Sequence, residues 1–349
     1  MNENAPSRKP QASSPKPGIR RICVICGSLL LLSCLRLDSF LFDPTRVTEY
    51  FNPADMDSSW HVRWVIPDSL IEPVTLAGLT GNHIYGFFVR QPADTDCADG
   101  DCPRMGTVPG KPQSAESAKS ADVTPNPQRV QSAESAKSAD VTSADRFTVI
   151  YNHGNGQNIN RYWGRVELLW EAGFDVFIYD YEGFGKSEGS PSGAACYADA
   201  EAALEYVRGR PDVVDSMVVY YAWSLGSFMA CHLAADLRKP RCLILENPMA
   251  SMSAVAKEGA VLGIPGSFLV DADFDNEARI PLVGCRTLII YGKKDDTAVP
   301  ERNALVLLDK ANPSATTSYP VEDANHSDLP ETMGYGEYER VVKAFIAGD

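Results

Sequence analysis

The sequence predicts a mixed α/β fold in which a mostly parallel central sheet is covered by helices on both faces. From about residue 147 onward, short apolar runs rich in β-branched and aromatic residues alternate with longer runs of helical periodicity. The apolar runs are nearly continuous, as expected of strands buried on both faces of a parallel sheet. Two alternating stretches precede them and indicate an antiparallel hairpin at the start of the sheet.

The bulk composition excludes several classes of protein. A chain of 349 residues with 44% hydrophobic content can bury a full core in one or two domains. The formal net charge of −14 argues against a nucleic-acid partner. The five histidines do not gather with cysteines at metal-ligand spacing. We therefore expect no metal site, no cofactor and no nucleic-acid binding.

The N-terminus has the layout of an export signal. A polar, basic stretch precedes an apolar run at residues 22–32, which is shorter than the ~20 residues of a membrane-spanning helix. The run ends in Leu-Leu-Ser-Cys, which resembles the lipobox of bacterial lipoproteins with Cys34 as the lipidated residue. We expect residues 1–34 to be a lipoprotein-like signal peptide and the protein to be exported and anchored in the cell envelope. A plain signal peptide, an uncleaved anchor extended to Phe42 and a chance cysteine are the alternatives.

The folded domain is expected to span residues 43–349 with one long interruption. Residues 74–79 and 83–89 read as the antiparallel hairpin. Residues 93–145 are rich in Ser, Ala, Asp, Pro and Lys and contain the same twelve-letter stretch, QSAESAKSADVT, twice. A short repeat without apolar periodicity cannot bury a core, so we expect a disordered, dispensable insertion. Within it, Cys97 and Cys102 are either a small disulfide or free thiols.

The remaining elements follow in regular alternation. Strands are predicted at residues 147–151, 176–179, 217–223, 242–246, 287–291 and 316–319, and helices at residues 164–171, 194–207, 227–237, 302–310 and 336–347. The segment between two of these strands, residues 249–280, stands where such a fold inserts a small cap. Its apolar residues form either one wall of an acyl pocket or a core-packing connection.

A possible nucleophile stands where one strand meets one helix. The run at residues 217–223 ends at Trp223, and a small-residue, helix-compatible run follows Ser224 at once, which places this serine on a sharp strand-to-helix turn. Such a turn needs small residues two positions before and after the serine, and these are Ala222 and Gly226. The usual form has glycine at both positions. The alternative is a buried strand followed by a helix that Ser224 merely caps.

A serine nucleophile needs a base, and His326 is the best candidate. It lies in a polar loop at residues 323–328, after the last predicted strand and before the last helix. Because the carboxyl ends of parallel strands share one edge of a sheet, this loop can approach Ser224. A histidine in this position would take the proton of the serine hydroxyl.

The carboxylate that holds the histidine has two adjacent candidates. Asp295 and Asp296 follow the strand that ends near Gly292. Distance from the strand favours Asp295, whereas counting back from Pro300 favours Asp296, and we lean to Asp295. Asp180, which also stands at a strand end, is a weaker third choice.

Backbone N–H groups would stabilise the oxyanion. One belongs to Leu225, directly after the serine, and the other to the glycine-containing loop at residues 153–158. Its glycines allow the backbone to turn an amide toward the site, so Asn155 is the expected second donor. We interpret His153, which precedes this turn, as structural.

In this order the parts resemble the α/β-hydrolase family. The matching motifs are His-Gly-Asn-Gly at residues 153–156, the glycine-rich loop at 180–189, the serine turn, Gly-x-x-Asp at 292–295 and Asn-His-Ser-Asp at 325–328. Together they cover most of residues 74–349 outside the insertion. The first two motifs look most like the membrane-associated esterase and lysophospholipase-like branch, which includes serine peptidase relatives. Ala222 and an aspartate-to-proline spacing one residue longer than usual depart from the pattern.

The resemblance implies a serine hydrolase of carboxylesterase or lipase type. Its substrate would be a small-molecule acyl ester, including lipid esters if the N-terminus anchors the protein to a membrane. A serine peptidase, a thioesterase or an acyltransferase of the same fold is the alternative within the family. A catalytically silent envelope protein that binds a partner or a lipid is the alternative outside it.

Overall fold

A computed structural model describes residues 42–51, 61–78, 81–92, 146–252 and 274–348. The expected signal region at residues 1–34, the insertion at 93–145 with its two cysteines, and residues 253–273 of the expected cap lie outside this part of the chain. In the described residues, no helix is both long enough and apolar enough to cross a membrane.

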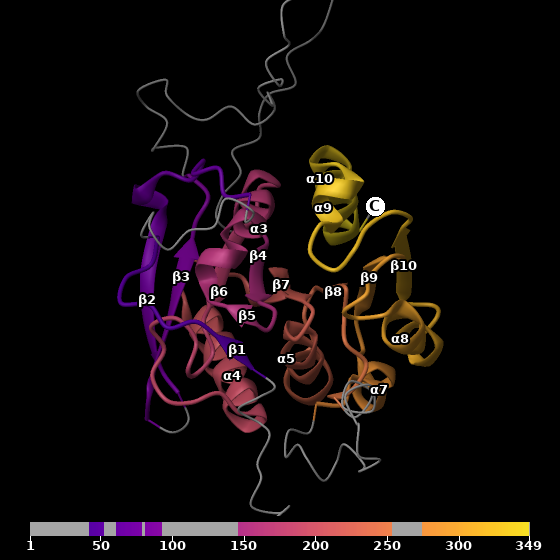
Figure 1. The fold of residues 1–349 in the computed structure, drawn as a ribbon. Helices are drawn as coiled ribbons and strands as arrows, with labels where there is room; N and C mark the ends of the chain where they lie inside the picture. The colour runs from indigo at the N-terminus through magenta and orange to yellow at the C-terminus, as the bar shows by residue number, and fades with distance from the viewer. Residues whose placement is uncertain (1–41, 52–60, 79–80, 93–145, 253–273, 349) are drawn as a thin grey trace, which may run out of the picture.

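A large, mostly parallel sheet forms the centre of the fold (Figure 1). In the described residues its strand order is β10-β9-β8-β7-β4-β6-β3-β2. Strand β3 pairs antiparallel with β2 and with β6, and all other pairs are parallel. The strands are β2 (Ile71–Ala77), β3 (His83–Val89), β4 (Thr148–Asn152), β6 (Asp175–Tyr179), β7 (Val218–Trp223), β8 (Cys242–Glu246), β9 (Arg286–Gly292) and β10 (Thr316–Val321). The predicted fold class, with its N-terminal hairpin, is confirmed.

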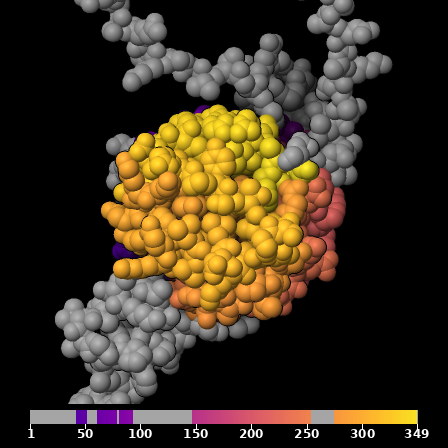
Figure 2. All heavy atoms as spheres, turned by 90° about the vertical axis from the view of Figure 1, so that its right-hand side faces the viewer, coloured from indigo at the N-terminus to yellow at the C-terminus, as the bar shows by residue number. Residues whose placement is uncertain are grey.

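Helices cover both faces of this sheet. Helices α3 and α10 pack on one face, and α4, α5 and α8 pack on the other. The helices are α3 (Ile159–Glu171), α4 (Gly193–Gly209), α5 (Gly226–His232), α7 (Asn276–Arg279), α8 (Ala304–Lys310), α9 (Leu329–Met333) and α10 (Tyr335–Ala347), and α5 continues as a π-helical turn (Leu233–Leu237). Figure 2 looks onto the β10 edge, where the orange and yellow C-terminal residues form a closed outer surface.

Burial on both faces explains the continuous apolar runs of the sequence. Every residue of β4, β6, β7 and β8 is buried. Neighbouring residues of one strand enter opposite cores: Ile150 packs with the helices α4 and α5, and Tyr151 packs with α3 and α10. Four cysteines in these cores are buried free thiols, as expected of small hydrophobic residues: Cys196, Cys231, Cys242 and Cys285.

Helix α3 begins earlier than the sequence pattern predicts, at Ile159 rather than near residue 164. Asn158 caps it, because its side chain accepts a hydrogen bond from the Asn160 N–H at 3.0 Å. Asn160 is itself fully buried and accepts a hydrogen bond from the backbone N–H of Phe51 at 3.0 Å. The polar residues at 158–160, which resemble a loop in the sequence, therefore form the N-terminal cap and the buried first turn of a helix.

The segment at residues 42–51, to which the sequence assigns no role, lies across two loops at the carboxyl edge of the sheet. Strand β1 (Asp43–Pro44) pairs in parallel with β5 (Gly156–Gln157), which follows the His-Gly-Asn-Gly loop. The guanidinium of Arg46 donates hydrogen bonds to two backbone carbonyls of the glycine-rich loop at residues 180–189. Residues 42–51 thus connect the loop that precedes β5 with the glycine-rich loop at residues 180–189.

Asp199 on α4 is fully buried beneath the glycine-rich loop. Its Oδ2 accepts a hydrogen bond from the Glu182 backbone N–H at 2.7 Å, while its Oδ1 meets no hydrogen-bond partner among the described residues. Burial, with a smaller contribution from the neighbouring Glu182, raises the pKa of Asp199 to about 8. This carboxyl group is neutral in the folded protein over a pH range in which it would be ionised in the unfolded chain.

We expect Asp199 to make stability fall with rising pH. Because its pKa is raised in the folded state, its favourable contribution is complete below about pH 4 and is lost as the pH rises through about 8. Asp199→Asn keeps the acceptor for Glu182 and removes the titration. Urea unfolding should show that the unfolding free energy of the wild type falls by on the order of 4 kcal/mol more than that of the variant between pH 5 and pH 9. If the unfolding free energies of the wild type and the variant changed equally with pH, the raised pKa would not belong to Asp199.

Candidate active site

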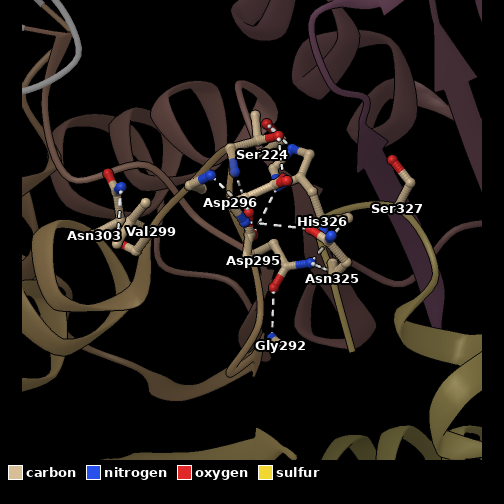
Figure 3. A network of polar contacts seen from close by, with 12 residues as sticks. Ser224, Gly292, Asp295, Asp296, Val299, Asn303, Asn325, His326 and Ser327 are labelled. Atoms are coloured by element: carbon tan, nitrogen blue, oxygen red, sulfur yellow. Dashed lines mark hydrogen bonds and ion pairs between the residues drawn. The ribbon is translucent and has the colours of Figure 1, made fainter. Parts of the chain in front are cut away.

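Three loops meet at the carboxyl edge of the sheet, and each carries one predicted residue (Figure 3). Ser224 follows β7, Asp295 lies three residues after the end of β9, and His326 lies in the loop between β10 and α9. Strands β7, β8, β9 and β10 are consecutive neighbours and all run parallel. The register of the parallel strands therefore brings together residues that are 31 to 102 positions apart in the sequence.

The three side chains form one continuous line of hydrogen bonds. His326 Nε2 lies 2.9 Å from Ser224 Oγ, and His326 Nδ1 lies 2.8 Å from Asp295 Oδ2. The Asp295 side chain is 1% exposed and that of His326 is 14% exposed. A carboxylate accepts the proton of Nδ1, which leaves the lone pair of Nε2 free to accept from the serine hydroxyl. This is the geometry of a nucleophile, a base and an orienting carboxylate.

The two adjacent aspartates lie in different environments. The Oδ1 of Asp295 accepts hydrogen bonds from the N–H groups of Thr297 at 2.9 Å and Ala298 at 2.7 Å, so both carboxylate oxygens are bound. Asp296 is exposed, and its Oδ1 accepts from the Thr297 hydroxyl at 3.4 Å. The contact with His326 is made by Asp295, which favours it over Asp296 as the orienting carboxylate.

The turn at Ser224 is strained and tightly packed. Ser224 has a φ of +55°, in the left-handed region that non-glycine residues rarely adopt. Its N–H donates to the Glu246 carbonyl at 3.0 Å, which ties the turn to β8. A Cβ at Gly226 would lie 2.0 Å from the Asn152 carbonyl oxygen, so only glycine fits there. Ala222, where glycine is usual, is accommodated in the fully buried β7 strand.

Gly226→Ala is expected to destabilise the protein by about 2–3 kcal/mol, because the new methyl group would force helix α5 away from β4. Urea unfolding measures this loss. Gly209→Ala at the end of α4 is the matched control, since a Cβ there meets nothing within 4 Å, and its midpoint should stay unchanged or rise slightly. Equal midpoints for the two variants would contradict the packing argument.

The proposed oxyanion loop lies directly beside the serine. A Cβ at Gly154 would lie 3.5 Å from the Ser224 Cβ, so the loop passes beside the serine at the residue that precedes Asn155. The Asn155 side chain accepts a hydrogen bond from the Asp43 N–H at 3.3 Å, which connects this loop to β1. Leu225 stands at the N-terminal end of α5, where backbone N–H groups have no acceptor within the helix. Leu225 directly follows Ser224, and Asn155 directly follows the glycine that approaches it.

His153, at the start of this loop, packs in the core beneath the active site rather than at it. It is fully buried, and its Nε2 lies 3.2 Å from the Oδ1 of the equally buried Asp180. The hydrogen bonds that Asp180 accepts come from the Tyr50 hydroxyl at 2.6 Å and the Ile159 N–H at 3.0 Å. Asp180 is thus engaged with His153 and the start of α3 rather than with His326. The structural interpretation of His153 agrees with these contacts.

A polar layer behind the histidine loop was missed by the sequence analysis. Glu246 at the end of β8 is fully buried and accepts hydrogen bonds from Arg165 at 2.7 Å and 3.0 Å. The Arg165 guanidinium lies 3.9 Å from the centre of the Trp223 ring and also donates to the Ser327 carbonyl at 3.1 Å. Asn247 follows Glu246. Two consecutive polar residues at the end of a buried strand, the last of the strand and the one after it, are the signal that could have identified this layer.

In the part of the chain that the structure describes, no group of three or more His, Cys, Asp or Glu side chains is placed to hold a metal ion.

The fold and the site together define a class of protein. It has a mostly parallel α/β sheet with a Ser-His-Asp arrangement at its carboxyl edge, and the serine lies on a strained strand-to-helix turn.

Comparison with known proteins places the chain within a family. A family model described as serine aminopeptidase, S33, matches residues 143–278. The alpha/beta hydrolase domain-containing protein 17B of Xenopus laevis is 30% identical over 206 residues, which are 58% of this chain and 67% of that protein. The uncharacterised protein YfhR of Escherichia coli O157:H7 is 35% identical over 156 residues, 44% of this chain and 54% of that protein. The chain belongs to the α/β-hydrolase family.

Solved structures agree on the fold. An esterase of Pyrococcus furiosus superposes with a TM-score of 0.56 at 14% identity, covering 88% of this chain and 98% of the esterase. At this identity the likeness concerns the fold alone. The chain spans only about half the length of the bacterial relatives that it matches, 54% in the case of YfhR.

Proposed function

We propose that the protein is a serine hydrolase that cleaves carboxylic esters through an acyl-enzyme intermediate on Ser224. The observation that carries this proposal is the line of hydrogen bonds from Ser224 Oγ to His326 and on to Asp295, at 2.9 Å and 2.8 Å. Membership of the α/β-hydrolase family supports it. The strained backbone of Ser224 supports it as well, because such strain is concentrated at functional residues.

In the proposed mechanism, Ser224 Oγ attacks the ester carbonyl while His326 Nε2 takes the hydroxyl proton. The N–H groups of Leu225 and Asn155 hold the oxyanion of the tetrahedral intermediate. As the intermediate collapses, the bond from carbon to the alcohol oxygen breaks, and His326 returns the proton to the departing alcohol. A water then attacks the acyl group with His326 again as base, and the acid leaves Ser224. Asp295 keeps the imidazole in the reactive tautomer throughout.

Aromatic packing beside the serine helix supports an apolar acyl group. Phe228, one turn along α5 from Ser224, stacks on Phe274 with ring centres 4.7 Å apart. Phe42 packs against Phe274 at 6.2 Å and against Phe184 of the glycine-rich loop at 6.3 Å. These rings are at most 5% exposed and form an apolar part of the core beside the helix that follows Ser224, and an acyl chain bound next to it would gain from burial. We therefore propose esters with apolar acyl groups, lipid esters among them, as the substrate class.

A serine peptidase is the second candidate function, favoured by the description of the matching family model. Assays with p-nitrophenyl esters from acetate to laurate, beside aminoacyl p-nitroanilides, separate the two. We expect ester turnover that improves with chain length and little release of p-nitroaniline. Anilide turnover without ester turnover would establish the peptidase instead. A thioesterase or an acyltransferase would show itself by preference for a thioester or by transfer to an added alcohol.

We also propose that the protein is exported and anchored to the envelope membrane through Cys34. The basic stretch, the short apolar run and the Leu-Leu-Ser-Cys motif support this placement. Fractionation of cells that express the wild type and Cys34→Ala tests it. Release of the variant from the membrane fraction, or accumulation of the unprocessed chain, is expected. Unchanged membrane partitioning would contradict lipidation at this cysteine.

We further propose that residues 93–145 are dispensable for folding. The described residues that flank this segment lie close together, because the Arg146 guanidinium donates hydrogen bonds to the carbonyls of Gln91 at 3.2 Å and Pro92 at 2.9 Å. A short loop can therefore replace the segment. The deletion should unfold cooperatively at the wild-type urea midpoint, and loss of the folded state would overturn this division of the chain.

A further inference from the structure

We propose that Trp223 and Asn247 position the catalytic base by holding the backbone carbonyl of His326 from two sides. This inference rests on the proposed function, in which His326 is the base. The His326 carbonyl oxygen accepts a hydrogen bond from the Trp223 indole N–H at 3.1 Å and another from the Asn247 amide N–H at 2.9 Å. A carbonyl oxygen has two lone pairs, so both are bound. The loop residue that carries the imidazole is thus fixed at its own main chain.

Asn247 joins the loop of the acid to the loop of the base. It is fully buried, with a φ of +42°, a conformation that asparagine tolerates better than most residues. Its Oδ1 accepts from the Gly292 N–H at 2.8 Å, at the end of the strand that leads to Asp295. Its amide nitrogen donates to the His326 carbonyl and also approaches the Asn325 carbonyl at 3.3 Å. One side chain therefore contacts both loops.

The two loops touch at the point where Asn247 spans them. A Cβ at Gly292 would lie 2.3 Å from the Ala324 carbonyl oxygen, so only glycine permits this approach. The backbone N–H of Asn247 also donates to the Ile290 carbonyl at 2.9 Å, which anchors the residue to β9. The amide thus has little freedom to turn, and the relative position of Asp295 and His326 depends on it.

Trp223 joins the strand of the nucleophile to the loop of the base. It directly precedes Ser224 and is 3% exposed. Arg165 lies over its ring at 3.9 Å and is held by Glu246, so the indole is fixed on that side. The Trp223 and His326 ring centres are 5.9 Å apart. Because the indole N–H binds the His326 carbonyl, it helps to set the distance between Ser224 Oγ and His326 Nε2.

Neither residue needs to touch the substrate for this role, so its loss should lower kcat and leave KM nearly unchanged. Trp223→Phe removes the indole N–H and keeps a ring against Arg165. Asn247→Asp tolerates the same backbone conformation, keeps an acceptor for Gly292 and removes both donors. We expect each variant to lower kcat on a p-nitrophenyl ester by about 10- to 100-fold with KM within about twofold of wild type.

Trp170→Phe is the matched control. Trp170 on α3 is also buried and donates its indole N–H to a backbone carbonyl, that of Arg90 at 3.0 Å, but it does not contact the site. The Trp170→Phe variant should keep the wild-type kcat even if its melting temperature falls. Trp223 and Asn247 bind the same acceptor. The fold-decrease in kcat of the double variant should therefore be smaller than the product of the fold-decreases in the two single variants.

Fluorophosphonate labelling of the wild type separates this inference from the proposed function. A folded wild type that does not label would refute the serine hydrolase itself. If the wild type labels, kcat within twofold of wild type in both single variants would overturn the positioning role. An increase in KM alone, or an equal loss of kcat in Trp170→Phe, would overturn it too. Multiplicative losses in the double variant would show that the two residues do not act through one carbonyl.

Discussion

Ser224→Ala is expected to lower kcat/KM on p-nitrophenyl esters by at least about 10⁴-fold, because no acyl-enzyme can form without the hydroxyl. The remaining histidine and oxyanion donors would leave only a small residual rate. The substitution changes one buried atom in a turn that already has a φ of +55°, so the variant should fold and melt close to the wild type. Initial rates and thermal unfolding of the same preparations measure both quantities.

Ser227→Ala is the matched control for this loss. Ser227 is also buried on helix α5, but its hydroxyl binds the Met249 N–H at 3.1 Å and the Asn276 amide at 3.0 Å rather than His326. It should retain most of the activity. A Ser224→Ala variant that keeps more than about a tenth of the wild-type rate would contradict the nucleophile assignment.

Asp295→Asn is expected to lower kcat by about 10⁴-fold, while Asp296→Asn changes kcat less than about twofold. An asparagine at position 295 cannot accept the Nδ1 proton as a carboxylate does, and it favours the wrong tautomer of His326. The side chain of Asp296 is exposed and does not bind the histidine. Steady-state kinetics of the two variants separate neighbouring residues of identical chemistry. The reverse order of effects would move the role to Asp296.

Most of the fold could be predicted because its signals are local. The strands are buried on both faces, so their letters form continuous apolar runs, and the helices between them keep their own period. Ser224 could be proposed because it stands directly after such a run, and His326 because it lies in the loop that follows the last strand, since the carboxyl ends of parallel strands meet at one edge. The start of α3 could not, because its first turn is largely polar and is buried through contacts with residues distant in the sequence, such as that of Asn160 with Phe51.

The choice between the aspartates depends on direction rather than on chemistry. In the folded loop, Asp295 turns inward to His326 and the N–H groups of Thr297 and Ala298, while Asp296 faces solvent. The two residues are chemically identical, so their residue type does not show which of them turns inward. The hold of Asn247 on the two loops likewise depends on strand register, since it joins residues 45 and 79 positions away. Such contacts become visible only when the sheet is assembled.

The most direct test of the account is to map the adduct of a fluorophosphonate probe on the folded wild-type protein. After labelling and proteolysis, peptide masses should place one adduct on Ser224, and His326→Ala should label far more slowly because the hydroxyl is no longer activated. An adduct on another serine, or a folded protein that takes up no probe, would contradict the central claim that Ser224 is an activated nucleophile.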